Sequence, residues 1–139
     1  MHRLSWLATA MVLAPASASL GANQGPQAPP CLSYEPDTIR VSGRLERLIH
    51  PGPPNYDDTT RGDRPEPYFY LRSAVPLCFR AAGSGDSLGA VYLVQLILPR
   101  GGYARLRPRL GKIVALTGTA FQAQTGHHHA PVVLTVALP

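Results

Sequence analysis

Polar and apolar residues alternate along most of this chain with a period of two, which is typical of β-strands that have one buried face. The alternation is clearest in residues 38–46, where Ile39, Val41 and Leu45 are separated by polar residues. Residues 91–98 are apolar on both faces, which predicts a central strand. The five predicted strands are 38–46, 68–72 continuing after a bend at 76–79, 91–98, 112–122 and 131–138.

The segments between these strands predict turns, loops and one short helix. Residues 50–67 carry five prolines, two glycines and four acids, so we expect a long loop, and loops of this length are usually functional or disordered. Residues 81–89 form a Gly/Ser-rich turn, and residues 124–130 form a hairpin loop. Tyr103, Leu106 and Leu110 have the spacing of a helix whose length Pro108 limits to one or two turns.

The order of these elements predicts an all-β fold, a small five-stranded OB-like Greek-key barrel with one short helix between strands 3 and 4. A small β-sandwich is the alternative, but it would not need a helix at that position. The barrel further predicts that residues 113–122 and 131–138 pair as a hairpin.

The first 18 residues have the features of a signal peptide: a basic start, an apolar stretch and a small-x-small cleavage site at residues 16–18, with residue 22 as an alternative end. Residues 19–30 read as a flexible Pro/Gly-rich leader, and residues 31–139 as a single OB-like β domain. The apolar stretch is too short to cross a bilayer, so we expect a periplasmic or secreted protein without a membrane span. Without the signal peptide the formal charge is +4, carried mainly by scattered arginines.

The two cysteines, Cys31 and Cys78, predict one disulfide, because an exported chain folds in an oxidising compartment. A cysteine metal site is the rival interpretation, but no Cys-x-x-Cys spacing supports it.

The two most polar loops are candidates for a shared binding site, because the corresponding loops of an OB-fold flank its ligand-binding face. We therefore expect a non-enzymatic module that binds an envelope component, a protein partner or a small polar ligand through residues 50–67 and 124–130. The candidate ligand-binding residues are His50, Tyr56, Asp63, Glu66, His127, His128 and His129.

A metal site is the alternative function of the histidines. In an extended segment His127 and His129 point to one side and His128 to the other. That pair can bind Zn²⁺ or Cu²⁺, with His50, Asp63 or Glu66 completing the site. The competing interpretation is that the histidines only pack and form hydrogen bonds around the hairpin.

The remaining motifs favour a non-enzymatic role, and no catalytic residue is predicted. Gly85-Asp86-Ser87-Leu88 matches a hydrolase motif, but the Asp-x-x-His that those enzymes require does not occur in this chain. The acids of residues 50–67 have no apolar wall that would raise the pKa of one of them. Tyrosines and arginines on the second and third strands would suit nucleic acid, but export argues against that partner.

Several distinctive segments resemble an exported bacterial family, domain of unknown function 4431 (DUF4431). They are 31–36 (CLSYEP), 51–56 (PGPPNY), Gly62-Asp63 with Glu66, 103–108, Gly111-Lys112, and 125–129 (TGHHH) followed by Pro131-Val132. The resemblance extends from Cys31 to Val136 and implies a bacterial periplasmic or secreted protein. It implies no activity and no catalytic residues.

Overall fold

The computed structural model describes residues 30–81 and 83–138. The predicted signal peptide, both of its alternative ends and positions 19–29 of the predicted leader lie outside these residues.

The described residues form an all-β fold with one short α-helix, as predicted. The strands are β1 (Leu32–Ser33), β2 (Thr38–Pro51), β3 (Pro65–Arg80), β4 (Ser87–Ile97), β5 (Ile113–Gln122) and β6 (Val132–Val136). The helical segments are η1 (Thr59–Arg61), α1 (Gly102–Leu106) and η2 (Arg107–Arg109). The α1 and η2 turns occupy the predicted position between the third and fourth long strands and end before Gly111, which has a φ of 79°.

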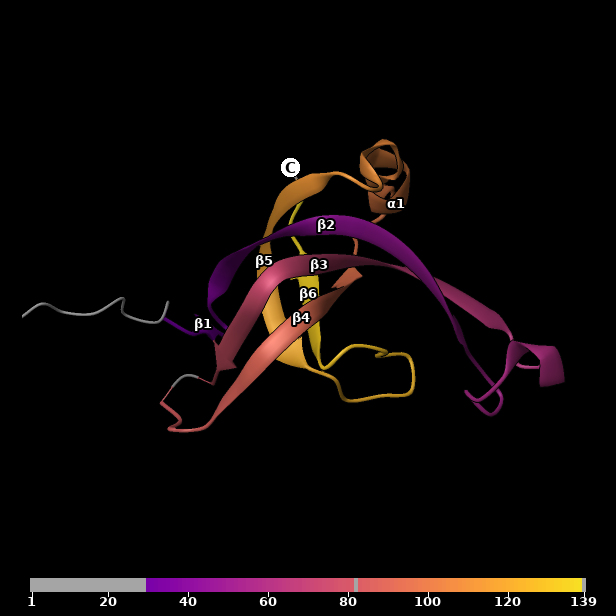
Figure 1. Ribbon diagram of the computed structural model, residues 1–139, viewed down its shortest axis with the longest axis horizontal. Helices are drawn as coiled ribbons and strands as arrows, with labels where there is room; N and C mark the ends of the chain where they lie inside the picture. The colour runs from indigo at the N-terminus through magenta and orange to yellow at the C-terminus, as the bar shows by residue number, and fades with distance from the viewer. Residues whose placement is uncertain (1–29, 82, 139) are drawn as a thin grey trace, which may run out of the picture.

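The strand pairings form a closed circuit. β2 pairs with β3 and β5, β5 with β6, β6 with β4, and β4 with β3. Figure 1 shows these long, curved strands wrapping around one another, with α1 at one end. The β5 and β6 strands pair as the predicted antiparallel hairpin, for example through Ala120 and Leu134.

The prediction of five strands missed β1, which makes the sheet six-stranded in the described part of the chain. β1 runs parallel to β3, with Leu32 opposite Phe79. Two residues are too few to show a period, so the sequence pattern could not reveal this strand.

Cys31 and Cys78 form the predicted disulfide, which links the residue before β1 to β3. A disulfide is typical of proteins that fold in an oxidising, extracellular-type environment. No helix among the described residues is long and apolar enough to span a membrane.

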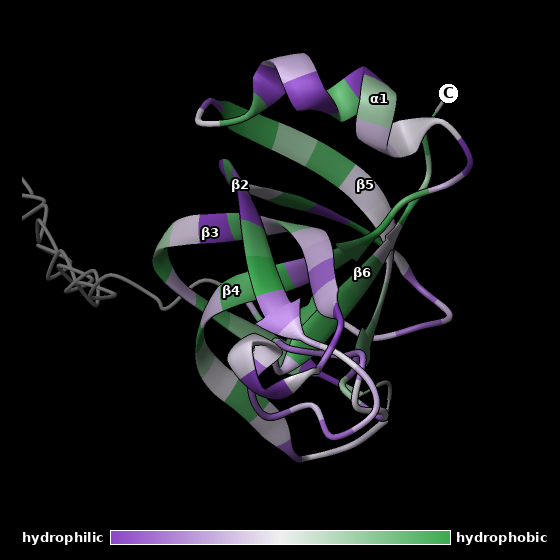
Figure 2. Ribbon diagram, turned by 90° about the vertical axis from the view of Figure 1, so that its right-hand side faces the viewer, coloured by the Kyte–Doolittle hydropathy of each residue, from purple (hydrophilic) through white to green (hydrophobic). Residues whose placement is uncertain are grey.

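The apolar core lies on one face of the strands. Leu71, Leu96 and Leu134 belong to it and are at most 1% exposed. Figure 2 shows the green apolar residues alternating with paler polar residues along the strands. This alternation is the two-residue period that the sequence displays.

A second set of buried residues lies on the opposite face of the same strands. Tyr70, Gln95 and Val133 are each at most 1% exposed and stand opposite one another on β3, β4 and β6. None of the three belongs to the apolar core cluster. We call these three residues the outer row; Gln95 contacts the hairpin loop that carries the histidines, and Tyr70 packs against His50.

The predicted loop 50–67 is shorter in the structure, because β2 and β3 continue as a two-stranded arm into both of its ends. His50 pairs with Glu66, and Pro51 pairs with Pro65. The loop itself is therefore 52–64. The five prolines of residues 50–67 hid the strand ends, since proline is disfavoured inside a sheet but tolerated at its edges.

Candidate functional site

Residues from the arm and from the hairpin loop 124–130 meet on one side of the molecule. Figure 1 shows the tip of the β2–β3 arm and the loop between β5 and β6 projecting to the same side. The two segments are more than 60 residues apart in the chain. Their meeting brings most of the candidate ligand-binding residues together.

Glu66 joins the two segments through both of its carboxylate oxygens. Its Oε1 lies 2.8 Å from Nδ1 of His127, and its Oε2 lies 3.3 Å from Nε2 of His129. The Glu66 side chain is 16% exposed, whereas that of His127 is 48% exposed. We call these three residues the Glu66 clasp.

Electrostatics favour the ionised carboxylate in this clasp. Burial alone raises the pKa of Glu66, but the hydrogen bonds and positive charges of His127 and His129 outweigh it and lower the pKa below its usual value. The carboxylate therefore holds the two segments together most firmly when it is charged.

The arm has room for Glu66 because residue 52 is a glycine. A Cβ at Gly52 would lie 2.5 Å from Cγ of Glu66, closer than carbon atoms approach each other without bonding. Any side chain at position 52 would therefore displace the carboxylate from the histidines.

His50 extends the clasp by stacking on His129. The two rings are 4.3 Å apart with an interplanar angle of 5°, and Tyr70 of the outer row packs against His50. Burial and the charge of His129 lower the pKa of His50. Its Nε2 is buried without a hydrogen-bond partner among the described residues. A neutral ring at this position suits the stack.

Tyr56 contacts the exposed side of the clasp. Its hydroxyl lies 3.1 Å from Nε2 of His127, and its ring meets the imidazole edge-on. Tyr56 has a φ of 58°, a left-handed conformation that is unfavourable for a residue with a side chain. A hydrogen bond from its N–H to the carbonyl of Gly52 holds this conformation.

Gln95 fixes the histidine backbone from below. Its amide nitrogen donates to the carbonyl of His127 at 2.8 Å, and its side-chain oxygen accepts from the N–H of His129 at 2.6 Å. Sequence reasoning missed this residue. The available signal was that Gln95 is the one strongly polar residue within the apolar run 91–98.

Asp63 and His128 are occupied inside their own loops. The Asp63 carboxylate accepts hydrogen bonds from the N–H groups of Asn55, Asp57 and Asp58, and these bonds lower its pKa. Nδ1 of His128 accepts from the N–H groups of Gln124 and Thr125. His128 is thus engaged within its own loop, where its N–H donates to the carbonyl of Thr125 in a turn, so the predicted extended segment is not present. Ligand contacts by Asp63 and His128 stay predictions.

The described residues include no group of three or more His, Cys, Asp or Glu side chains arranged to hold a metal ion. Both ring nitrogens of His127 and Nε2 of His129 already face protein atoms. A metal would have to replace these hydrogen bonds, so the metal alternative stays a prediction.

A groove of about 850 Å³ adjoins the clasp. It lies between the arm and the α1–η2 turns, and its lining includes Arg47, Glu66, Tyr68, Tyr103 and Arg107. Tyr68 connects the groove to the clasp, since its ring lies 5.9 Å from that of His129. The sequence did not place Tyr103 beside Arg47 and Tyr68, because Tyr103 comes from a different element.

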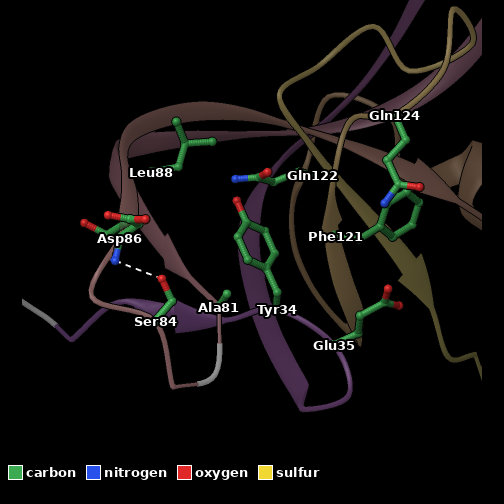
Figure 3. A pocket seen from close by; sticks show the side chains of 10 residues that line it. Tyr34, Glu35, Ala81, Ser84, Asp86, Leu88, Phe121, Gln122 and Gln124 are labelled. Carbon is green, nitrogen blue, oxygen red and sulfur yellow. Dashed lines mark hydrogen bonds between the residues drawn. The ribbon is translucent and has the colours of Figure 1, made fainter.

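A smaller hollow of about 480 Å³ lies near β1 and the end of β5. Figure 3 shows the Tyr34 hydroxyl directed toward the side chain of Gln122, with Glu35 and Asp86 at the margins. None of the predicted ligand-binding residues lines this hollow.

The family model for a domain of unknown function, DUF4431, matches residues 93–137. Comparisons with curated proteins and with solved structures gave no match. The matched range includes Gln95 and all three loop histidines but not the β2–β3 arm, and it is shorter than the range of resemblance that begins at Cys31. From β4 to the end of β6, this chain is similar to the DUF4431 family.

Proposed function

We propose that this chain is an exported binding module whose ligand contacts the surface formed jointly by residues 50–67 and 124–130. The observation that carries this proposal is the Glu66 clasp, which joins the arm to the histidine loop through both carboxylate oxygens. Surface loops that are held in place by a rigid scaffold commonly carry binding functions.

The closed circuit of pairings supports an OB-like barrel of five strands, β2 to β6, with β1 added at one edge. In such a barrel, the loops after the first strand and before the last strand flank the ligand-binding face. Here these are the loops that the clasp brings together. The barrel assignment thus supports a shared binding surface.

The disulfide and the signal-like start of the chain support a periplasmic or secreted location. The module then meets its ligand outside the cytoplasm. An envelope component, a protein partner or a small polar ligand all fit this location.

The contacts suit a binding surface that is held in a fixed geometry. Glu66 directs both oxygens at histidines, and His127 uses one ring nitrogen for Glu66 and the other for Tyr56. Groups that are hydrogen-bonded to one another in this way hold a surface in one geometry, which lowers the cost of ordering it when a ligand binds.

The loop surface can be tested by capturing ligands from an extract of the cell envelope. The immobilised mature chain is compared with Tyr56→Phe and His127→Ala variants. We expect His127→Ala to capture the ligand roughly tenfold more weakly, since a contact residue contributes about 1–2 kcal/mol to binding. Its free energy of unfolding should change by no more than about 1 kcal/mol.

Tyr92→Phe is the matched control for Tyr56→Phe, because Tyr92 is an exposed tyrosine on β4, 48% accessible to solvent. Equal capture by the folded loop variants and the wild type would overturn the proposal. If Tyr92→Phe loses as much capture as Tyr56→Phe, the binding surface lies elsewhere than the two loops.

The alternative function is Zn²⁺ or Cu²⁺ binding by His127, His129 and His50, and the convergence of these rings on one side of the molecule is what favours it. It predicts saturable metal binding by calorimetry that disappears in a His127→Ala/His129→Ala double variant. Metal binding that persists in the double variant would exclude this site.

A further inference from the structure

The groove beside the clasp has the size and composition of a ligand site. Its volume of about 850 Å³ falls within the roughly 300–1,000 Å³ of typical small-molecule sites. One wall comes from the arm and carries Glu66 and Tyr68, and the other comes from α1 and η2. A ligand in the groove would therefore reach the clasp.

The two arginines of the groove are positively charged and are not neutralised by an ion pair with a neighbouring acid in the described part of the chain. Arg47 and Arg107 are exposed, and neither forms an ion pair within the described residues. By contrast, Arg61 pairs with Asp57 and Asp58, and Arg72 pairs with Glu46. Guanidinium groups suit carboxylate and phosphate groups, to which they can donate two parallel hydrogen bonds.

The acid that lines the groove does not cancel this charge. Two arginines outnumber this one acid, and both oxygens of Glu66 are already hydrogen-bonded to His127 and His129. The complementary ligand of the groove is therefore an anion.

Two tyrosines add flat, partly apolar surfaces. Tyr103 is 38% exposed, and its ring packs edge-on against Phe69 at 5.1 Å, which fixes its orientation. Burial raises the pKa of both Tyr68 and Tyr103, so their hydroxyl groups stay protonated and can donate hydrogen bonds. Tyrosine thus offers one ring face for stacking and one polar group for a hydroxyl-rich ligand.

We propose that this groove binds an acidic carbohydrate, with Arg47 and Arg107 contacting carboxylate groups and the tyrosines contacting sugar rings. The proposal names the ligand class of the proposed module and in that sense rests on the proposed function. A carbohydrate fits better than nucleic acid, because the disulfide indicates an extracellular-type environment, where acidic polysaccharides are common polyanions.

The test is an isothermal titration of the mature chain with three defined probes at low and at physiological salt. The probes are a galacturonate hexamer, its uncharged methyl ester, and a single-stranded DNA oligomer of the same charge. We expect saturable binding of the galacturonate hexamer, with roughly tenfold weaker binding of the ester and of the DNA. The affinity for the acid should fall as salt rises.

Variants locate the binding within the groove. We expect Arg47→Gln and Arg107→Gln each to weaken binding roughly tenfold, as the loss of a charge-assisted hydrogen bond does. Tyr103→Leu should weaken it several-fold. The matched controls are Arg109→Gln, in the same helical turn as Arg107, and Arg40→Gln, on the same strand as Arg47, because neither residue lines the groove.

The outcomes separate this proposal from the proposed function. Absence of binding, equal binding of DNA, or equal weakening by Arg109→Gln would overturn the carbohydrate groove. If ligand capture still depends on Tyr56 and His127, the loop-surface function survives that result. Conversely, acid binding that depends on the arginines supports the groove even if Tyr56 and His127 prove dispensable for capture.

Discussion

The apolar core and the outer row are buried to the same extent on opposite faces of the same strands, yet they are built from different chemistry. Leu71 and Leu96 face the core, whereas their chain neighbours Tyr70 and Gln95 face outward. The core is covered by other strands of the sheet. Gln95 in the outer row is covered by a loop, whose backbone polar groups need partners when they are buried.

This difference explains why a polar side chain lies in the outer row. Gln95 supplies one donor and one acceptor, and the loop offers the carbonyl of His127 and the N–H of His129. An apolar residue there would leave both loop groups unsatisfied. The core therefore stabilises the sheet, and the outer row places the candidate site upon it.

The largest expected effect is in the core. Leu71→Ala should lower the free energy of unfolding by about 2–5 kcal/mol, because it removes buried apolar volume and leaves a cavity. Urea unfolding followed by circular dichroism measures this change. Val75→Ala is the control on the same strand, where the side chain is 61% exposed and we expect a change within about 0.5 kcal/mol. Equal effects of the two variants would contradict the assignment of the core.

A smaller effect is expected in the outer row. Gln95→Leu should lower the free energy of unfolding by about 1–3 kcal/mol, because the carbonyl of His127 and the N–H of His129 lose their partner. Hydrogen exchange should show faster exchange at the His129 amide while β2 and β5 keep their protection. Gln124→Leu, in the exposed part of the loop, is the control. Unchanged exchange at His129 would mean that Gln95 does not hold the loop.

The difference between the apolar core and the outer row also decides what could be predicted from the sequence. The core follows from the two-residue period, so the long strands and the β5–β6 hairpin were predictable. The convergence of His50, Glu66 and His127 follows from the predicted fold, although the sequence pattern predicts a loop where the arm carries Glu66. The role of Gln95 could not be derived, because it depends on which face of β4 the loop covers.

The smallest effect concerns the clasp that joins the loop to the arm. The pKa of Glu66 is lowered in the folded protein, so folding favours its charged form. Its contribution to stability is therefore complete above the ordinary glutamate pKa of about 4.3 and is lost as pH falls through the lower folded value. Since His127 is half exposed, we expect this contribution to stay below about 1 kcal/mol.

Urea unfolding of the wild type and of Glu66→Gln across roughly pH 3–6 measures this contribution. The stability difference between the two proteins should shrink as the pH falls below about 4. His50, whose pKa is also lowered, is present in both proteins, so its own titration contributes little to the difference. Glu35→Gln is the matched control, because Glu35 is exposed and lies outside the clasp. If the stability difference between the wild type and Glu66→Gln stays constant over this pH range, the carboxylate charge does not hold the arm to the loop.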